Sequence, residues 1–522
     1  MRLYDILDYR AREQGEAAFA IQGDRRITYR EAQAETHRLA HGLIMAGLQR
    51  GDRMAILSKN SVEFMLLYFA AAKTGIVPVP LNYRLAPTEW AYILNDAGAK
   101  ILFAGNDYPH QVDSVREELK TVARFIVIGE ADDPRWETYH DFTAGQPDTP
   151  PNCHVTPDDD LFQLYTSGTT GHPKGAVLTH RAVTTHLFQM GIAHNIQPGE
   201  RLLLVAPVFH VAALNAGAFP CLAAGGCLTI LADFKPAEVV RVLSEEQIGI
   251  AILVPAMIQA CLTAVPDIAQ RNYENLRLIH YGASPIAAAT LRRAIETFQC
   301  EFSQGYGMTE MSAAIAILSW ADHQRALQEN PGLLLAAGRP ILGTEVQIVD
   351  TEDNPLPNGT IGQVLARGPQ MMNGYWQQPE ATAEALRGGW MHTGDAGILD
   401  DEGYLYIQDR VKDMVVSGGE NVYPRIVEEV LFKHPAVAEA AAIGVPDEKW
   451  GESIKAIVVL RQGMIATEEE IIHFCRGKLG GFERPRSVDF VDTLPRTPSG
   501  KVLKRVLREP YWAGQVRRVA GV

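Results

Sequence analysis

The sequence predicts an α/β protein with a large N-terminal domain of βαβ subdomains, a β-rich subdomain, and a small α+β C-terminal domain. Short apolar strands alternate with helical segments from residue 28 onward, which is typical of mostly parallel sheets covered by helices. Glycine-containing turns then mark a strand-rich region between residues 358 and 403. The pattern changes again near residue 409, and the roughly 110 residues that follow suffice for an independent domain.

The first elements of the large domain are predicted from helix caps and apolar runs. Thr28 and Glu31 form a capping-box pattern at the start of a helix, and Gly47 and Gly75 follow helical segments where a left-handed residue ends a helix. The same signals recur along the domain. The expected elements are helices over residues 32–46 and 62–73 and strands over 54–58, 76–81, 100–104, 202–205, 250–254 and 277–281.

A charge-free run over residues 202–232 is long enough to span a bilayer. Pro207, Pro220 and the Gly225-Gly226 pair interrupt it. We therefore expect a strand, a helix and a strand inside the core, and no integral membrane segment.

The C-terminal domain is expected to follow a junction at residues 409–413, so that residues 1–408 form the N-terminal domain and 414–522 the C-terminal one. Its pattern mixes helices with strands. The expected elements are helices over 425–433 and 467–479 and strands over 437–445, 454–460 and 488–491.

The charge balance bears on partners and compartment. Lys and Arg number 48 against 62 Asp and Glu, and a net charge of −14 disfavours a broad grip on nucleic acid or anionic lipid. The six cysteines lack CxxC spacing, which indicates free buried thiols in a reducing compartment. No secretory signal opens the chain, so we expect a cytoplasmic protein.

A loop rich in hydroxyl groups and glycine follows the apolar strand at residues 161–164. Exposed backbone amides, hydroxyl donors and one lysine are what a polyphosphate needs. Pro173 stands where a Walker A loop requires glycine, so this is a different type of nucleotide-phosphate loop. Its predicted phosphate-binding residues are Thr166, Ser167, Gly168, Thr169, Thr170, Gly171 and Lys174.

Further short motifs follow the loop, at residues 207–210, 282–285, 306–310, 390–395, 409–413, 417–421 and 495–501. In this order they resemble the adenylate-forming enzymes, specifically the acyl-CoA synthetases of the fatty-acid and 4-coumarate CoA ligase type. The resemblance covers nearly the whole chain. It implies the adenylate-forming enzyme fold, with a mobile C-terminal domain.

The resemblance also implies an ATP site. Glu310 would hold Mg²⁺, Tyr306 would stack on adenine, and Asp395 would accept the ribose hydroxyls. Taken singly, each residue also fits an ordinary structural role. Glu310 is as typical of a solvated surface group, Tyr306 of a core aromatic and Asp395 of a salt-bridge partner. The implied ATP- and coenzyme A-binding residues beyond the loop are Gly282, Ala283, Ser284, Tyr306, Gly307, Met308, Thr309, Asp395, Arg410, Lys412, Gly418, Gly419 and Lys501.

Two C-terminal sites carry the implied chemistry. Lys501 would neutralise charge where the carboxylate meets the α-phosphate, although a lysine in such a turn is more often only solvated. Gly418 and Gly419 would line a narrow pantetheine passage, and Lys412 would be the pivot of the hinge. The implied catalytic residues are Lys501, Glu310, His210 and Thr166.

The implied reaction forms an acyl-adenylate from ATP and then a thioester with coenzyme A. Gly307 stands where acetyl-specific relatives carry tryptophan, and Phe209-His210 where amino-acid-activating relatives carry aspartate. An apolar acid is thus favoured, either a medium- or long-chain fatty acid or an aryl acid. The implied acid-binding residues are His210, Val211, Ala212, Asn215, Tyr281, Gly307 and Met308.

Two related activities share the adenylation step. One is transfer of the acyl group to a carrier-protein phosphopantetheine, and the other is a luciferase-like oxygenase. The partner expected from the resemblance is a small carboxylic acid, and a homodimer is compatible with it.

Overall fold

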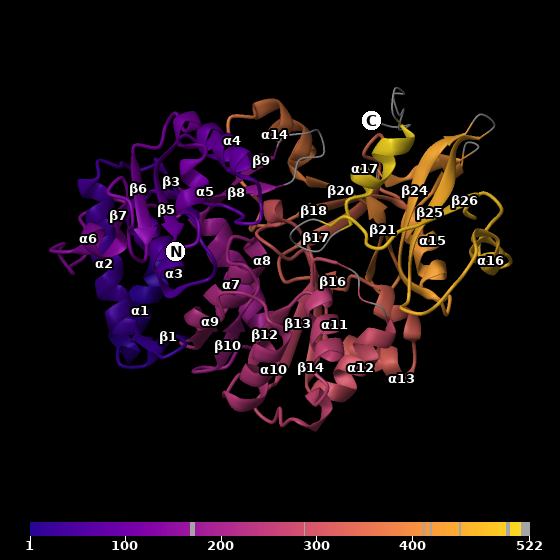
Figure 1. The fold of residues 1–522 in the computed structure, drawn as a ribbon, viewed down its shortest axis with the longest axis horizontal. Helices are drawn as coiled ribbons and strands as arrows, with labels where there is room; N and C mark the ends of the chain where they lie inside the picture. Colours follow the sequence, from indigo (N-terminus) through magenta and orange to yellow (C-terminus); the bar gives the residue numbers. More distant parts are fainter. Residues whose placement is uncertain are drawn as a thin grey trace.

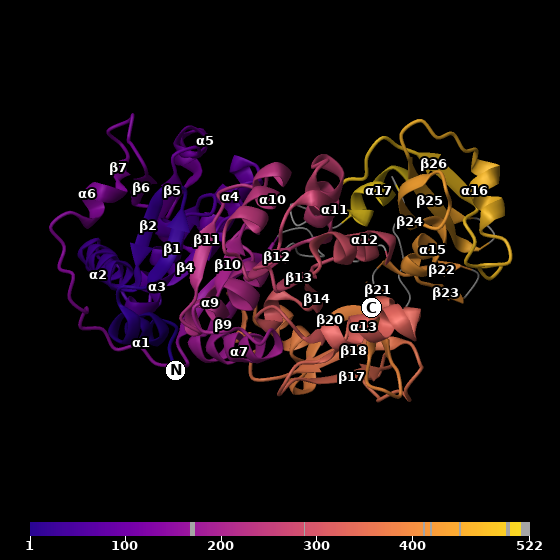
Figure 2. The ribbon, with the colours of Figure 1, turned by 90° about the horizontal axis from the view of Figure 1, so that it is seen from below.

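A computed structural model describes residues 1–166, 173–284, 286, 288–410, 413–417, 420–447, 450–496 and 502–512, without the side chains of 409, 410, 420 and 421. The N-terminal part of the chain forms the indigo and magenta body in Figures 1 and 2, and the C-terminal domain lies at the opposite end. The predicted α/β architecture with a large and a small domain is confirmed.

A parallel five-stranded sheet with the order β4-β3-β5-β6-β7 lies in the first subdomain. The predicted capping box is present, since the Thr28 hydroxyl accepts from the amide of Glu31 and the Glu31 carboxylate accepts from the amide of Thr28. Gly75 ends the third helix, α3, at φ +72°. The elements are α1 (Tyr4–Gln14), α2 (Tyr29–Met45), β3 (Arg53–Leu57), α3 (Val62–Thr74), β4 (Val77–Pro80), α4 (Pro87–Ala97), β5 (Ala99–Gly105), α5 (Pro109–Asp113), η1 (Arg116–Glu118), β6 (Arg124–Ile128), β7 (Glu137–Thr138) and α6 (Tyr139–Thr143).

A nine-stranded sheet with the order β16-β15-β14-β13-β12-β10-β11-β1-β2 forms the centre of the large domain. Its six middle strands, β14 to β1, are parallel, so their carboxyl ends share one edge. Its strands are β1 (Ala18–Gln22), β2 (Arg25–Thr28), β10 (Arg201–Leu204), β11 (Cys227–Ile230), β12 (Ile250–Leu253), β13 (Leu278–Gly282), β14 (Glu301–Tyr306), β15 (Ala316–Leu318) and β16 (Arg339–Pro340). The helical elements of this part are α7 (His180–Ala193), α10 (Pro236–Glu245), α11 (Pro255–Ala264), η3 (Ile268–Gln270), α12 (Ala288–Phe298), η4 (Thr309–Met311), α13 (Trp320–Gln328) and η5 (Pro331–Leu335).

The charge-free run folds as expected, with a strand at each end and helix between. Strands β10 and β11 flank α8 (Val211–Ala213), a π-helix η2 (Leu214–Ala218) and α9 (Phe219–Ala223). Most of these side chains are buried. Over the described ranges, no helix is long and apolar enough to cross a membrane.

Two small sheets complete the large domain. Strands β8 (Asp160–Thr166), β9 (Lys174–Thr179) and β19 (Gly374–Tyr375) form one antiparallel sheet. The predicted β-rich region forms the other, with the order β17-β18-β20-β21. Its elements are β17 (Glu345–Val349), β18 (Gly362–Arg367), α14 (Pro379–Ala385), η6 (Arg387–Gly389), β20 (Met391–Leu399) and β21 (Leu405–Arg410). Strand β21 runs past residue 408, where we placed the end of the N-terminal domain.

The C-terminal domain has a five-stranded sheet and hydrophobic clusters formed by its own residues. Helix α16 ends at Phe474, so the expected helix over 467–479 is too long; Gly477 at φ +71° turns the chain soon after that end. The elements are β22 (Val415–Ser417), β23 (Glu420–Val422), α15 (Pro424–Leu431), β24 (Val437–Asp447), β25 (Gly451–Leu460), α16 (Glu468–Phe474), β26 (Ser487–Phe490), α17 (Lys504–Arg508) and η8 (Glu509–Tyr511). The six cysteines are free, and five of them are buried.

Candidate active site

The phosphate loop connects the two strands of a hairpin. Strands β8 and β9 are antiparallel, with Thr166 opposite Lys174. Of the predicted loop residues, Ser167, Gly168, Thr169, Thr170 and Gly171 lie outside the described residues. Thr166 and Lys174 thus mark the ends of the loop, at the edge where β19 joins the same sheet.

Glu310 lies beside this hairpin. It is 5% exposed, in η4, and its Oε1 accepts a 2.8 Å hydrogen bond from the hydroxyl of Tyr375. The Nζ of Lys174 lies 5.2 Å from the centre of the Tyr375 ring. Tyr375 therefore links the loop lysine to the predicted metal ligand. Sequence reasoning missed Tyr375, because a Gly-Tyr-Trp run in a strand-rich region has no distinctive signal.

The donor set at Glu310 fits Mg²⁺. A carboxylate is a hard ligand, and Mg²⁺ takes most of its remaining ligands from water and phosphate oxygens. Within the described ranges, no group of three or more His, Cys, Asp or Glu side chains is arranged to hold a metal. One protein carboxylate next to a phosphate loop suits an ion that arrives with a nucleotide.

Tyr306 and Asp395, the predicted adenine and ribose residues, are in contact. The Tyr306 hydroxyl donates a 2.6 Å hydrogen bond to Oδ2 of Asp395, which is 7% exposed. Tyr306 ends β14 of the nine-stranded sheet, whereas Asp395 lies in β20 of the four-stranded sheet. In backbone register, Asp395 is opposite Arg410, whose side chain is not described. The contact joins two sheets at one site.

Glycines bring the ends of β13 and β14 close together. A side chain at Gly282 would place its Cβ 2.5 Å from the carbonyl oxygen of Gly305, and one at Gly307 would overlap the carbonyl oxygen of Ala313. Ala283 follows in a left-handed conformation, at φ +67°. The predicted residues from Gly282 to Ser284 and from Tyr306 to Glu310 thus lie at the carboxyl edge of the parallel strands, where α/β sheets bind ligands.

Four of the predicted acid-binding residues lie together around α8 and η2, whereas Tyr281 points elsewhere. Asn215 is fully buried in the π-helix η2 and donates through Nδ2 to the carbonyl of Ser312, next to the Tyr306–Glu310 segment. His210 and Val211 lie at the start of α8, and Ala212 is exposed. Helical π-turns are frequent at functional sites.

Tyr281 does not join them through its side chain. It is fully buried in the cluster on the opposite face of β13, and its hydroxyl is 2.8 Å from Nε2 of His323. Strand alternation places the side chain of His280, not that of Tyr281, on the face toward α7 and η2. His280 was not among the residues that the sequence indicated.

The predicted residues of the C-terminal domain fall mostly outside the described ranges. Lys412, Gly418, Gly419 and Lys501 are all among the undescribed residues. Ser417 and Glu420 pair across β22 and β23, on either side of the glycine pair. The roles of these four residues remain predictions.

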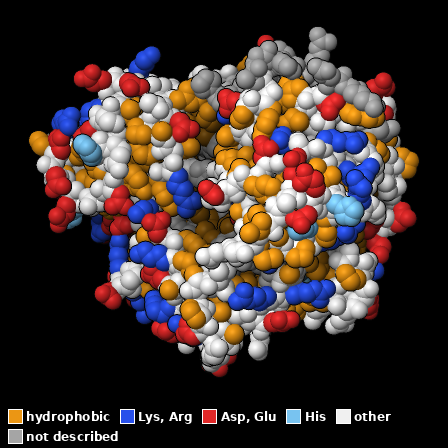
Figure 3. Space-filling view, turned by 45° about the vertical axis from the view of Figure 1, so that its right-hand side comes forward, with side chains coloured by type: hydrophobic (Ala, Val, Ile, Leu, Met, Phe, Trp, Pro, Cys, Tyr) orange, Lys and Arg blue, Asp and Glu red, His pale blue; other side chains and the backbone are white. Residues whose placement is uncertain are grey.

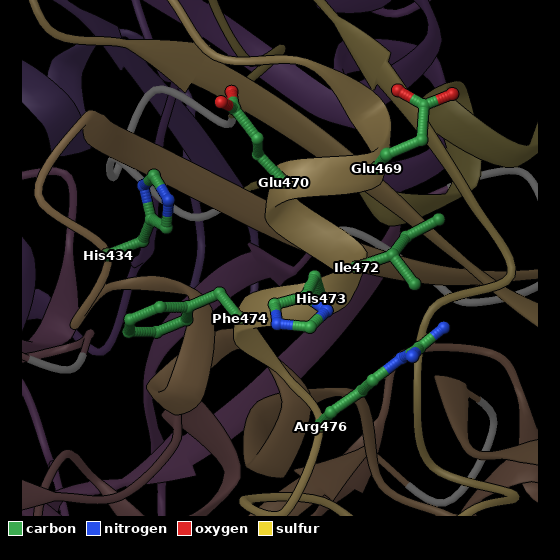
Figure 4. Close-up of a pocket in the computed structure, with 7 residues that line it drawn as sticks. All are labelled: His434, Glu469, Glu470, Ile472, His473, Phe474 and Arg476. Carbon is green, nitrogen blue, oxygen red and sulfur yellow. The ribbon is translucent and has the colours of Figure 1, made fainter.

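A shallow hollow of about 520 Å³ lies elsewhere on the C-terminal domain (Figure 4). Its lining comes from α16 and from residues that follow α15 and α16, and none of the predicted site residues belongs to it. The lining residues are His434, Glu469, Glu470, Ile472, His473, Phe474 and Arg476. In Figure 3, acidic and basic side chains are interspersed over one face of the molecule, around a central hollow.

Comparison with known proteins matches most of the chain to two domains of one enzyme family. The AMP-binding enzyme family matches residues 7–376, and the AMP-binding enzyme C-terminal domain matches residues 426–501.

Three curated relatives cover nearly the whole chain. A fatty acid–[acyl-carrier-protein] ligase of Streptomyces coeruleorubidus is 38% identical, over 95% of this chain and 93% of its own. A feruloyl-CoA synthase of an Amycolatopsis species is 37% identical, over 96% and 97%. A long-chain-fatty-acid–CoA ligase of Mycobacterium tuberculosis is 38% identical, over 94% of each chain.

The fold is also similar to that of solved structures. An anthranilate CoA ligase in complex with anthranoyl-AMP superposes with a TM-score of 0.88 at 27% identity, covering 98% of this chain and 97% of that one.

Proposed function

The chain belongs to the AMP-binding enzyme family, and on that premise we propose that it is an ATP-dependent acyl-CoA synthetase acting on an apolar carboxylic acid. Two contacts carry the proposal: Tyr306 donates to Asp395, and Glu310, four residues along the chain, accepts from Tyr375, whose strand pairs with the phosphate-loop hairpin. In the sequence, Tyr306 and Glu310 belong to one motif, and Asp395 belongs to another about 85 residues later. In the proposed site Glu310 would be the metal ligand, Tyr306 the ring that stacks on adenine and Asp395 the carboxylate that binds ribose.

The first step joins the acid to AMP. A carboxylate oxygen of the acid attacks the α-phosphorus of ATP, a P–O bond forms, and the bond to the pyrophosphate oxygen breaks. Mg²⁺ held by Glu310 would offset charge on the phosphate oxygens. Lys501 and the loop donors would stabilise the negative charge that develops at the α-phosphate.

The second step forms the thioester. The sulfur of coenzyme A attacks the acyl carbonyl carbon, a C–S bond forms, and the C–O bond to AMP breaks with AMP as the leaving group. The thiol proton passes to solvent. No nucleophilic side chain of the protein is required, so positioning and charge neutralisation supply the catalysis.

The product nucleotide tests the reaction class. The protein is incubated with ATP, MgCl₂, coenzyme A and a panel of acids graded by length and aromaticity, and nucleotides are separated by chromatography. We expect AMP and pyrophosphate in equal amounts, together with acyl-CoA. ADP as the stoichiometric product would contradict the proposal.

The acceptor is tested separately, because relatives at similar identity are named for coenzyme A and for a carrier protein. We propose coenzyme A. Mass spectrometry of a reaction containing equal amounts of coenzyme A and a phosphopantetheinylated carrier protein should show acyl-CoA as the main product. Light emission with luciferin would instead indicate the oxygenase activity.

We further propose that the protein is cytoplasmic and forms a homodimer. Light scattering of the purified protein tests the homodimer.

A further inference from the structure

Three polar side chains form a hydrogen-bonded chain beneath the site. Nδ1 of His280, on β13, lies 2.8 Å from the hydroxyl of Ser303 on β14 and 3.0 Å from Nε2 of His194, which follows α7. All three side chains are buried, at 6%, 4% and 2% exposure. One ring nitrogen of His280 thus serves both neighbours.

The other ring nitrogen of His280, Nε2, takes no part in this hydrogen-bonded chain. This nitrogen has no hydrogen-bond partner among the described residues. Nor is it one of the completely covered polar atoms. A Cβ at Gly305 would lie 2.9 Å from Nε2 and from Cε1 of the ring, so this glycine leaves that edge of the imidazole uncovered. A polar nitrogen on a side chain that is otherwise buried needs a hydrogen-bond partner, and at this partly accessible edge the partner is water or a ligand.

Its position points toward the acid rather than the nucleotide. His280 precedes Gly282 by two residues on β13, which places it about 7 Å from the strand end along the strand. Helix α7, which His194 follows, packs on the π-helix η2 that carries Asn215. His280 therefore lies deeper than the nucleotide residues, on the side of the predicted acid-binding residues.

The electrostatics of this nitrogen select the kind of group it can bind. Burial lowers the pKa of His280 to about 4, so its ring is neutral at pH 7. A neutral imidazole nitrogen accepts from a hydroxyl or an N–H group when it carries no proton, and donates to a hydroxyl when it carries one. A plain alkyl chain would leave it unpaired, and a site built to hydrogen-bond a substrate group rejects the analogue that lacks it.

We propose that His280 recognises a hydroxyl or N–H group on the body of the acid, so that the preferred substrate is a polar-substituted aryl acid and not an unsubstituted fatty acid. This inference rests on the proposed function, because it refines which acid the same site takes. Ser303 and His194 position the ring, and Gly305 keeps its free edge open.

Matched pairs of acids test the proposal. Pyrophosphate release is measured with 4-hydroxycinnamate against cinnamate, 3-hydroxycinnamate against cinnamate, indole-3-acetate against 1-naphthaleneacetate, and 8-hydroxyoctanoate against octanoate. We expect kcat/KM to favour the polar member of at least one aryl pair by about tenfold, the ratio that one hydrogen bond supplies. A ratio near one for every pair would overturn the proposal.

Two variants locate the effect. His280→Phe should reduce the preferred pair's ratio to near one, mainly by lowering kcat/KM for the polar acid. Gly305→Ala should do the same by covering Nε2 while retaining the imidazole. His323→Phe is the matched control, because His323 is also buried but bonds Tyr281 on the opposite face of the sheet. It should keep the ratio of the unmodified protein.

The outcomes separate this inference from the proposed function. If no acid yields AMP, the proposed function fails and this inference fails with it. If acids are activated but both variants keep the ratio, only the role of His280 is wrong. Circular dichroism shows whether each variant folds. If His280→Phe does not fold, the ratio measured for Gly305→Ala decides whether His280 has this role.

Discussion

Two phenolic hydroxyls hold the carboxylates of the site. Tyr375 donates to Glu310, and Tyr306 donates to Asp395. Both carboxylates are buried, where polar groups need hydrogen-bond partners. If Glu310 and Asp395 bind the metal and the ribose as proposed, each tyrosine fixes the direction in which a carboxylate oxygen faces the ligand.

Tyr375→Phe should weaken the response to magnesium. Without the phenol, Glu310 loses the bond that orients it, so the Mg²⁺ concentration for half-maximal pyrophosphate release should rise about three- to tenfold. Tyr306→Phe is the matched control, because it removes a phenol from Asp395 and should raise the KM for ATP with a smaller change in the Mg²⁺ requirement. Equal Mg²⁺ curves for Tyr375→Phe and the unmodified protein would contradict this role.

Gly307→Ala should destabilise the protein rather than reshape the acid pocket. The added Cβ would overlap the backbone of Ala313 and Ala314, which cannot move as a side chain can. We expect a loss of about 1–3 kcal/mol in the free energy of unfolding, measured by urea denaturation. A fully stable variant with an altered acid preference would show instead that this segment adapts.

Contacts that support the candidate site were harder to predict than its motif residues. Asp395 and Tyr306 were assigned from the family resemblance, and the structure brings them into contact, while their roles toward ribose and adenine remain predictions. Tyr375 and His280 were missed, because their roles depend on contacts between strands far apart in the sequence. Tyr281 was assigned to the acid although its side chain faces the other cluster, since motif position does not determine which face of a strand a residue occupies.

At the scale of elements, the phosphate-loop hairpin is anchored through side chains at its base. The Arg53 guanidinium lies 3.5 Å from the centre of the Trp376 ring and donates to Gln163 on β8. The Trp376 indole N–H donates to the carbonyl of Asp96, whose carboxylate accepts from the hydroxyl of Tyr165. The hairpin is thus held against the first subdomain.

Trp376→Leu should loosen this anchor. The indole contacts are lost while the amino-acid sequence of the loop is unchanged. We therefore expect the KM for ATP to rise about tenfold, with a smaller change in the KM for the acid. Steady-state kinetics with each substrate varied in turn measures the split. The control is Trp136→Leu, because Trp136 is buried against Phe125 in the first subdomain and its indole N–H donates to Asp113. Equal rises in both KM values would argue against the anchor.

Helix and strand prediction succeeded where local signals agree. The capping box at Thr28 and the left-handed Gly75 fixed two helix ends. The helix expected over 467–479 ran too far, because the pattern of apolar residues continues past Phe474 while the backbone turns at Gly477. Sheet order could not be read at all, since β1 pairs with β11 across some 200 residues.

At the scale of the whole molecule, acid should destabilise the protein through its buried histidines. Burial lowers the pKa of His180, His186 and His280 to about 4, whereas unfolded histidines titrate near 6.5. Between these values the unfolded state binds more protons, so the free energy of unfolding falls as the pH drops from 6.5 toward 4. Thermal unfolding across this range checks the direction, and constant stability from pH 7 to 4.5 would contradict it.

The two half-reactions should separate by mutation if the C-terminal domain alternates between two poses. Lys501→Ala should slow acyl-adenylate formation by about a hundredfold and spare thioester formation from supplied acyl-adenylate. Gly419→Leu should do the reverse by obstructing the thiol. Single-turnover assays of each step measure this. Equal impairment of both steps by both variants would exclude the alternation.

The overlap that any side chain at Gly307 would meet also bears on redesign. An engineer who wants a new acid preference gains nothing from randomising that position, since the backbone of Ala313 leaves it no room. Positions on the paired strands β13 and β14 are the better choice. A side chain at Gly305 would meet only the ring of His280 and no backbone, so a combinatorial library confined to His280, Ser303 and Gly305 would test acid preference with fewer chains that do not fold.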